Sequence, residues 1–258
     1  MKLSSILLFA EVVAAARLTQ YRRNAAAKRA MDRKTLPKQT ADGVANSTEV
    51  EYSSNWAGAV IVSTDVTSVT ALVTVPSVSA GTSSGSSSYS CASAWVGIDG
   101  DTCDTAILQT GIDFCVENGE TVYEAWYEWY PDYAYDFDLT VSEGDVISMT
   151  VTATSETAGT AVLENQTTGE SVTHSFDGNV EGDLCLENAE WIVEDFESDS
   201  SLVPFADFGS VTFTDATATI GGETVDAGDY TAIIDIEQDN SVLTSCSASD
   251  ETVTCTYV

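Results

Sequence analysis

Basic residues are absent from most of this sequence. All nine lysines and arginines lie between Lys2 and Lys38, whereas all but two of the 41 acidic residues lie between Gln39 and Val258. A tail of one charge sign is usually disordered, but this stretch also holds tryptophan, tyrosine and valine in regular patterns, which predicts a folded domain. Such a domain repels itself at neutral pH, while near pH ~4 much of its charge disappears. The composition favours a protein that acts in an acidic medium over the alternative of a solubilising, halophile-like surface.

Histidine is almost as rare, because His174 is the single one. A Ser-His-Asp or Cys-His system would have only this candidate base, and a catalytic zinc site normally needs several histidine or cysteine ligands. The acidic segment with Asp99, Asp101 and Asp104 raises the alternative of a Ca²⁺ loop, but a hairpin turn containing glycine explains it better. We therefore expect no metal and no cofactor. The remaining candidates for catalytic groups are carboxyl and carboxamide side chains.

The N-terminal part of the chain predicts two segments outside the folded domain. Residues 1–16 begin with Lys2, continue with an apolar run interrupted by Glu11, and end in three alanines, as in a signal peptide. Residues 17–50 are basic and predict a pro-segment. A nucleic-acid-binding patch is the alternative, but such an arm would first bind the acidic domain attached to it. We expect secretion, no nucleic-acid partner and no membrane anchor, since no other segment is long and apolar enough to cross a bilayer.

Residues 51–258 predict one all-β domain. From Trp56 onward, short β-branched and aromatic runs are separated by Gly, Ser, Asn and Asp, which is typical of a sandwich or barrel. All six cysteines follow residue 90 and suit a disulfide framework in an oxidising compartment. Asn46 and Asn165 begin Asn-x-Ser/Thr sequons, which are glycan acceptors in a secreted chain.

Side-chain alternation gathers polar residues on one face of two of these runs. Residues 91–99 and 105–114 both have apolar residues at most even positions, which predicts two strands with one buried face. If they form a hairpin with Cys91 opposite Cys115, Gln109 faces Gly97, and Trp95 and Asp99 are diagonal neighbours.

Two further runs add carboxyl groups. Glu194 lies between Ile192 and Phe196 on its own face of the run 190–197, which predicts either a strand edge or a site where desolvation alters the pKa of the carboxyl. The run 122–130 places Glu124 and Glu128 on one face, with Trp126 between them. Core packing is the alternative for its aromatic residues.

Five motifs, in this order, resemble the glutamic peptidases (eqolisins) across residues 51–258: SSNWAGAV, AWVGIDGDTCDTAILQTGIDF, YEAWYEWYPD, AEWIVEDFE and VPFADFGSVTFT. The resemblance implies a pepstatin-insensitive acid endopeptidase of fungal type, folded as a sandwich of two large antiparallel sheets. It implies Gln109 and Glu194 as the catalytic pair. Supporting positions in the substrate cleft are Trp95, Asp99, Glu124 and Glu128, where the family often has Asp in place of Glu124.

The same resemblance suggests a disulfide between Cys103 and Cys185. Cys246 and Cys255 flank a short polar turn, which leaves Cys91 with Cys115, the pair that the hairpin register also favours. Some members of the family carry a small disulfide loop after the catalytic strand, where this chain has ESDSSLVPF without cysteine.

A carboxyl group titrates in the acid range, so Glu194 is the candidate general base and then general acid, and the amide of Gln109 would orient water and stabilise the oxyanion. The expected partners are protein or peptide substrates and the chain's own basic pro-segment, which we expect to inhibit the enzyme; the mature protein is expected to be a monomer. The alternatives are a lectin-like sandwich that binds glycans and a glycosidase that uses a carboxyl pair such as Glu128 and Glu194.

Overall fold

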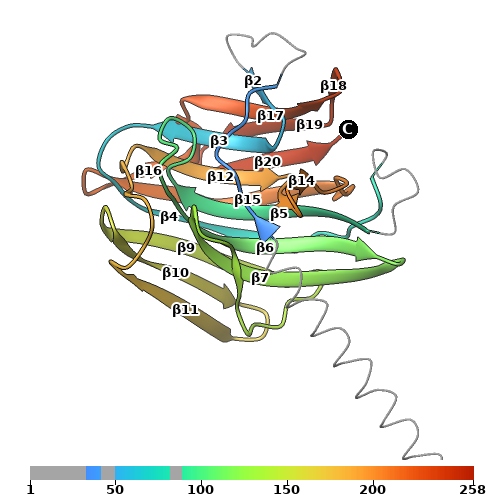
Figure 1. The fold of residues 1–258 in the computed structure, drawn as a ribbon, viewed down its shortest axis with the longest axis horizontal. Coiled ribbons are helices and arrows are strands. Elements are labelled where there is room, and N and C mark those ends of the chain that lie inside the picture. Colours follow the sequence, from blue (N-terminus) through green and yellow to red (C-terminus); the bar gives the residue numbers. More distant parts are fainter. Residues whose placement is uncertain (1–32, 42–49, 82–88) are drawn as a thin grey trace, which may run out of the picture.

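Two large β-sheets make up the protein in the computed structural model, which describes residues 33–41, 50–81 and 89–258 (Figure 1). The nine-stranded sheet runs in the order β18 (Ser241–Val242), β17 (Ala232–Gln238), β3 (Trp56–Val62), β12 (Asn188–Glu194), β5 (Tyr89–Ile98), β6 (Ile107–Glu117), β7 (Glu120–Tyr130) and β8 (Tyr135–Asp136). Its remaining strand, β2 (Val50–Ser53), pairs in parallel with β17, whereas the other pairs are antiparallel.

The eight-stranded sheet runs in the order β11 (Glu170–Asp177), β10 (Ala158–Asn165), β9 (Val146–Ser155), β4 (Val66–Thr74), β15 (Ser210–Ile220), β20 (Thr252–Tyr257) and β19 (Thr244–Ser249), with β16 (Glu223–Asp226) paired to β15. A short 3₁₀ turn, η2 (Ala227–Asp229), follows β16. A third, small sheet joins β1 (Arg33–Lys34), β13 (Glu197–Ser198) and β14 (Ser201–Leu202). The predicted all-β sandwich is confirmed.

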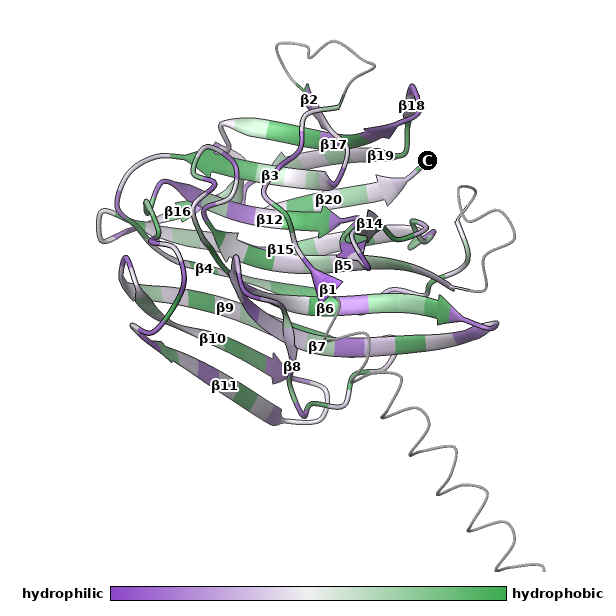
Figure 2. Cartoon of the chain, viewed as in Figure 1, coloured by the Kyte–Doolittle hydropathy of each residue, from purple (hydrophilic) through white to green (hydrophobic). Residues whose placement is uncertain are grey.

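The main core lies between the two large sheets and follows from period-two alternation. Hydrophilic and hydrophobic residues alternate along β9, β10 and β11 (Figure 2), and in β9 Ile147, Met149 and Val151 are fully buried while their neighbours are partly exposed. Trp191 and Phe114 meet this layer from the nine-stranded sheet. Burying each such side chain contributes about 1.5–3 kcal/mol, so the alternation fixes which face of each strand turns inward.

The strands β5, β6 and β12 are buried on both faces, which a strand at a sandwich surface normally is not. The inner face packs on the core, and a second cluster covers the outer face, formed by Trp56, Val60, Trp95, Ile107, Trp126, Ala134, Ile192 and Ile234. Segment 33–41 lies over the same outer face, with β1 in front of β5 and β6 in Figure 2. This outer face carries the residues singled out by the sequence.

The structure contains three disulfides, Cys91–Cys115, Cys103–Cys185 and Cys246–Cys255, the same pairs that the family resemblance implies. The predicted hairpin register is confirmed, because Cys91 is the partner of Cys115 and Gly97 is the partner of Gln109.

Asn165, one of the two predicted glycan acceptors, has its side chain engaged within the fold. Its side chain is fully buried; Nδ2 donates to the carbonyl of Thr140 at 3.1 Å and to Asp145 at 2.9 Å, while Oδ1 accepts from the backbone N–H of Thr167. A sugar on Nδ2 would replace one of its two hydrogens and so remove at least one of these donated bonds. Use of this sequon stays a prediction.

Several other predictions concern residues outside the described part of the chain, namely the signal peptide 1–16, the pro-segment up to residue 32 and Asn46. Within the described part, no helix has the length and apolar character needed to cross a bilayer.

Candidate active site

Four neighbouring strands bring the predicted catalytic residues to one face of the nine-stranded sheet. Gln109 on β6 is the partner of Gly97 on β5 and of Glu128 on β7. Glu194 on β12 is the partner of Ser93 on β5. Because Ser93 and Gly97 are four residues apart, their side chains point to the same face, and Gln109 and Glu194 share that face. We call it the active-site face.

The floor of the active-site face is the indole of Trp95. Glycines on two sides make room for it, since a Cβ at Gly97 would lie 2.7 Å from the indole ring and a Cβ at Gly111 would lie 2.5 Å from the Cβ of Trp95. Trp56 packs edge-on against the indole with ring centroids 5.0 Å apart. The indole is thereby fixed, and its Nε1 donates a 2.9 Å hydrogen bond to Oε2 of Glu194.

The carboxyl group of Glu194 is fully buried and receives two hydrogen bonds. Besides the indole N–H, the backbone N–H of Leu36 donates to Oε1 at 3.4 Å. Burial raises the pKa of Glu194 to about 8, although the charge of Arg33 and these hydrogen bonds oppose the shift. In the covered site Glu194 therefore carries a proton throughout the acid range.

Gln109 is also fully buried, and neither polar atom of its side-chain amide has a hydrogen-bond partner among the described residues. An amide without partners in such a place keeps both its donor and its acceptor for a group that enters the site. Beside it, burial raises the pKa of Glu128 to about 8, with Arg33 opposing and Glu194 adding to the shift.

Arg33 fills the centre of this face and was not predicted as a site residue. Its Nε donates to Oδ2 of Asp113 at 2.7 Å and its Nη2 to Oδ1 at 3.0 Å, a bidentate pair, while Nη1 is 3.4 Å from Oε2 of Glu128. Arg33 and Asp113 are both buried. One guanidinium thus faces three acids, Asp113, Glu128 and Glu194, and the short bidentate contact marks Asp113 as its ionised partner.

Two aromatic rings also contact the guanidinium of Arg33. Its central carbon lies 3.9 Å from the ring centroid of Trp126 and 4.6 Å from that of Phe196. Cation–π contacts of this kind are strengthened when the cation is removed from water. The pocket around Arg33 therefore selects a flat cation by shape as well as by charge.

The chain on either side of Arg33 is bound through its backbone. Ala134 donates its N–H to the carbonyl of Arg33 at 3.5 Å, and the N–H of Thr35 donates to Oε1 of Glu128 at 3.3 Å. Asn55 donates its Nδ2 to the carbonyl of Leu36 at 3.3 Å. Because these hydrogen bonds involve only backbone groups of the segment, another peptide bound in the same position could form them as well.

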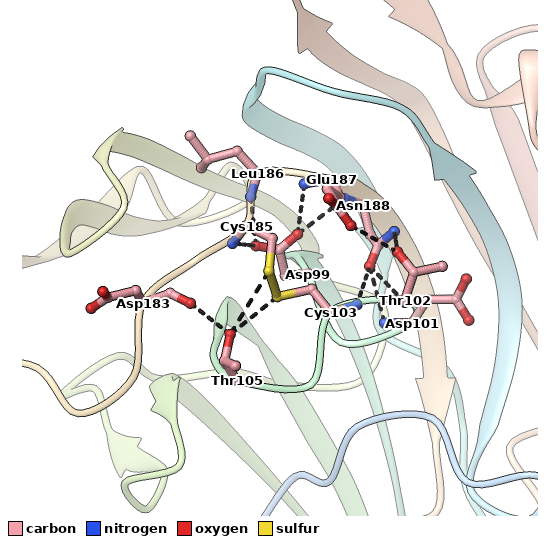
Figure 3. The surroundings of a disulfide bond; sticks show 10 residues. All are labelled: Asp99, Asp101, Thr102, Cys103, Thr105, Asp183, Cys185, Leu186, Glu187 and Asn188. Atoms are coloured by element: carbon pink, nitrogen blue, oxygen red, sulfur yellow. Dashed lines mark hydrogen bonds between the residues drawn. A yellow bond between two sulfur atoms is a disulfide. The ribbon is translucent and has the colours of Figure 1, made fainter.

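Asp99 does not point to this group. Its carboxylate accepts four backbone N–H groups from residues 185–188 at 2.7–3.1 Å, beside the Cys103–Cys185 disulfide (Figure 3). All its strong acceptor positions are used, and both neighbouring sulfurs are in the disulfide, so this cluster offers no metal ligands. Asp99 anchors the lead-in to β12, the strand that carries Glu194.

The other supporting residues lie as their strands dictate. Trp95 and Glu128 contact the catalytic candidates or their neighbours, whereas Glu124 is half-buried as the partner of Asp113. Alternation places Asp113 on the same face of its strand as Gln109, four residues away, but Asp113 was not predicted as a site residue. The missing information was its cationic partner, Arg33.

Comparison with known proteins gives one family. The model of the peptidase A4 family matches residues 54–257. The chain is 59% identical to aspergillopepsin-2 of Aspergillus niger over 284 residues, covering all of both chains, and 48% identical to scytalidopepsin B of Scytalidium lignicola over 221 residues, covering 83% of this chain and 81% of that one. A crystal structure of scytalido-glutamic peptidase with a transition state analog inhibitor superimposes with a TM-score of 0.73 at 49% identity, covering 80% of this chain and 98% of that one. This chain belongs to the peptidase A4 family.

Proposed function

We propose that this protein hydrolyses peptide bonds by direct attack of water, with Glu194 as general base and acid and Gln109 as the group that orients water and stabilises the oxyanion. Membership in the peptidase A4 family, together with relatives named as glutamic peptidases, makes it a glutamic-type endopeptidase rather than a glycan-binding protein or a glycosidase. The choice of these two residues rests on their chemistry and position.

The observation that carries the proposal is a peptide segment whose backbone already lies against Glu194. The backbone N–H of Leu36 is 3.4 Å from Oε1 of Glu194, and the preceding residue, Thr35, is held by Glu128. A general acid that protonates a leaving amine must stand within reach of that nitrogen. The bond between Thr35 and Leu36 therefore occupies the position expected of a substrate's reacting bond.

In the proposed reaction, ionised Glu194 takes a proton from water as its oxygen attacks the carbonyl carbon, and the C=O π electrons move to oxygen. The N–H of Gln109 donates to this oxyanion, while its carbonyl holds the water; an amide does this at any pH because it does not titrate. Protonated Glu194 then gives its proton to the amine nitrogen as the C–N bond breaks. No covalent intermediate is formed.

The pro-segment would suppress this chemistry in two ways. It occupies the active-site face with its own backbone, and by burying Glu194 it keeps the carboxyl protonated, with a pKa of about 8, so that it is not a base. Departure of the segment would admit water and return the pKa towards its ordinary value. Protonation of Glu194 by itself favours the covered state, so we propose that release needs stronger acid, where protonation of Asp113 would remove the anion that holds Arg33.

Secretion and a monomeric mature enzyme are part of the same proposal. Three disulfides within a single chain of this size suit an oxidising, extracellular setting.

The test is turnover of a denatured protein in acid by the processed enzyme, with and without pepstatin. Glu194→Gln should lower kcat at least about a hundredfold while the thermal midpoint stays within a few degrees. The matched control is Glu187→Gln, on the lead-in to the same strand, which should keep normal turnover. A folded Glu194→Gln enzyme with substantial turnover would refute the assignment.

A further inference from the structure

A second basic residue of the bound segment has its own acidic partners, away from Arg33. Lys38 forms a salt bridge through Nζ with Oδ1 of Asp101, and Nζ also donates to Oε2 of Glu51 at 2.8 Å. Its backbone N–H donates to the carbonyl of Gly100 at 3.0 Å. The side chain of Asp101 is 4% exposed and that of Glu51 is 40% exposed, so Asp101 is the better-shielded partner.

The position of Lys38 along the segment shows which residue of a substrate would make the same contact. Leu36 donates its N–H to Glu194, so Lys38 is the third residue after the bond that lies at the reacting position. We propose that Asp101, assisted by Glu51, forms a subsite that binds a lysine or arginine side chain at the third position after the cleaved bond of a substrate. The inference rests on the proposed function, because Glu194 sets the register.

The turn that carries Asp101 is held by hydrogen bonds to another part of the domain. Oδ1 of Asn188 accepts the N–H of Asp101 at 3.2 Å and of Thr102 at 2.9 Å, which pins the turn to the start of β12. The turn borders a cavity of about 360 Å³ whose lining includes Tyr130 and the pro-segment residues themselves. When the segment leaves, this space is open to the corresponding part of a substrate.

Few of the nearby carboxyl groups supply negative charge to the ammonium group of Lys38. Glu190 lies fully buried nearby, and burial, followed by the charges of Asp101 and Asp99, raises its pKa well above the usual range. Glu190 is therefore neutral in acid, and Asp99 is engaged by backbone N–H groups. Asp104 lines the same cavity, but Asp101 and Glu51 are the two acids that contact the ammonium group of Lys38, which assigns the selection of a cation to them.

The experiment compares two peptides of identical sequence, cut at one bond that mass spectrometry identifies, with lysine or norleucine at the third residue after that bond. Norleucine keeps the aliphatic stem and lacks only the ammonium group. The processed wild type should favour the lysine peptide about tenfold in kcat/KM, which corresponds to about 1.4 kcal/mol. Asp101→Asn should bring this ratio below about twofold, and Asp101→Glu should restore part of it. The control Asp65→Asn, at an exposed turn elsewhere, should keep the wild-type ratio.

A wild-type ratio within twofold of one, or an unchanged ratio in Asp101→Asn, overturns the subsite. The wild-type ratio decides the question by itself if Asp101→Asn does not fold. Failure of the proposed function is a different result, since it would be seen as turnover by Glu194→Gln, whichever peptide is used.

Discussion

Replacing Arg33 by glutamine should abolish most of the inhibition that we propose for the pro-segment. Arg33 is buried and supplies the only cation in contact with Asp113 among the described residues, and two rings cover its guanidinium. Removing one partner of a buried ion pair costs about 3–5 kcal/mol. When Arg33 is absent, Asp113 is able to take up a proton and so avoid a buried unpaired charge. The expected loss of binding free energy is therefore near 3 kcal/mol, which raises Ki about a hundredfold.

The assay is inhibition of the processed enzyme by synthetic peptides spanning residues 17–41. The matched control is Lys34→Gln, because Lys34 is half-buried and its ammonium group is 5.0 Å from the ring of Tyr130. A contact of this kind is worth about 0.5–1 kcal/mol, so Ki should rise about two- to fivefold. The reasoning is refuted if Arg33→Gln changes Ki less than fivefold, or if Lys34→Gln has the larger effect.

The same inhibition should depend on pH with a definite sign. Burial raises the pKa of Asp113, although Arg33 opposes the shift, so protonation begins above the ordinary aspartate range. The segment binds Asp113 in its ionised form, but by covering Glu194 and Glu128 it also raises the pKa of each to about 8, so its binding takes up protons at these two carboxyls. Ki should therefore fall as the pH falls from about 8 to about 5, and rise again only in stronger acid, where Asp113 takes up a proton. A Ki that rises as the pH falls from ~8 to ~5 would contradict this coupling.

Three further outcomes are expected. The thermal midpoint of the processed enzyme should fall as the pH rises above about 4, because burial raises the pKa of Asp235 to about 6 and also raises that of Asp195 well above its usual range. The native state then holds protons that the unfolded chain releases, and equal midpoints at pH ~4 and ~7 would contradict this. Asp99→Asn should cost about 3 kcal/mol and lower the midpoint by about 6–12 °C, because an NH₂ group would face two backbone donors; calorimetry measures it, and a loss below 1 kcal/mol would exclude the anchoring role. Peptide mass mapping should find Asn165 without a glycan, and a glycan there on folded enzyme would contradict the buried geometry.

Alternation was enough to predict the faces of the strands and the pairing of Gln109 with Gly97, because period two is a local property that a hairpin transmits directly to its partner. It also predicted that Glu194 sits among apolar residues, and the structure finds this carboxyl fully buried. Asp99 was assigned to the cleft from motif position, yet its carboxylate turns to the loop of residues 185–188. The direction of a side chain at the end of a strand is set by the neighbouring loop, which alternation does not describe.

The contacts of Arg33 lay beyond such reasoning. Its partners Asp113 and Glu128 are 80 and 95 residues away along the chain. Charge balance predicted attraction between the basic segment and the acidic domain. It could not predict which of the several basic residues occupies the active-site face. The choice comes from a flat guanidinium fitting between two rings, which depends on the assembled sheet.

The most direct test of the catalytic pair is the kcat of Glu194→Gln, Gln109→Ala and the double variant, measured on one peptide with the processed enzyme. If the two residues act as a unit on one transition state, each single change should lower kcat by at least about a hundredfold, and the double variant should be no slower than the slower single variant. A single variant that keeps more than a tenth of wild-type kcat, or a double variant whose loss is the product of the two single losses, would contradict the account.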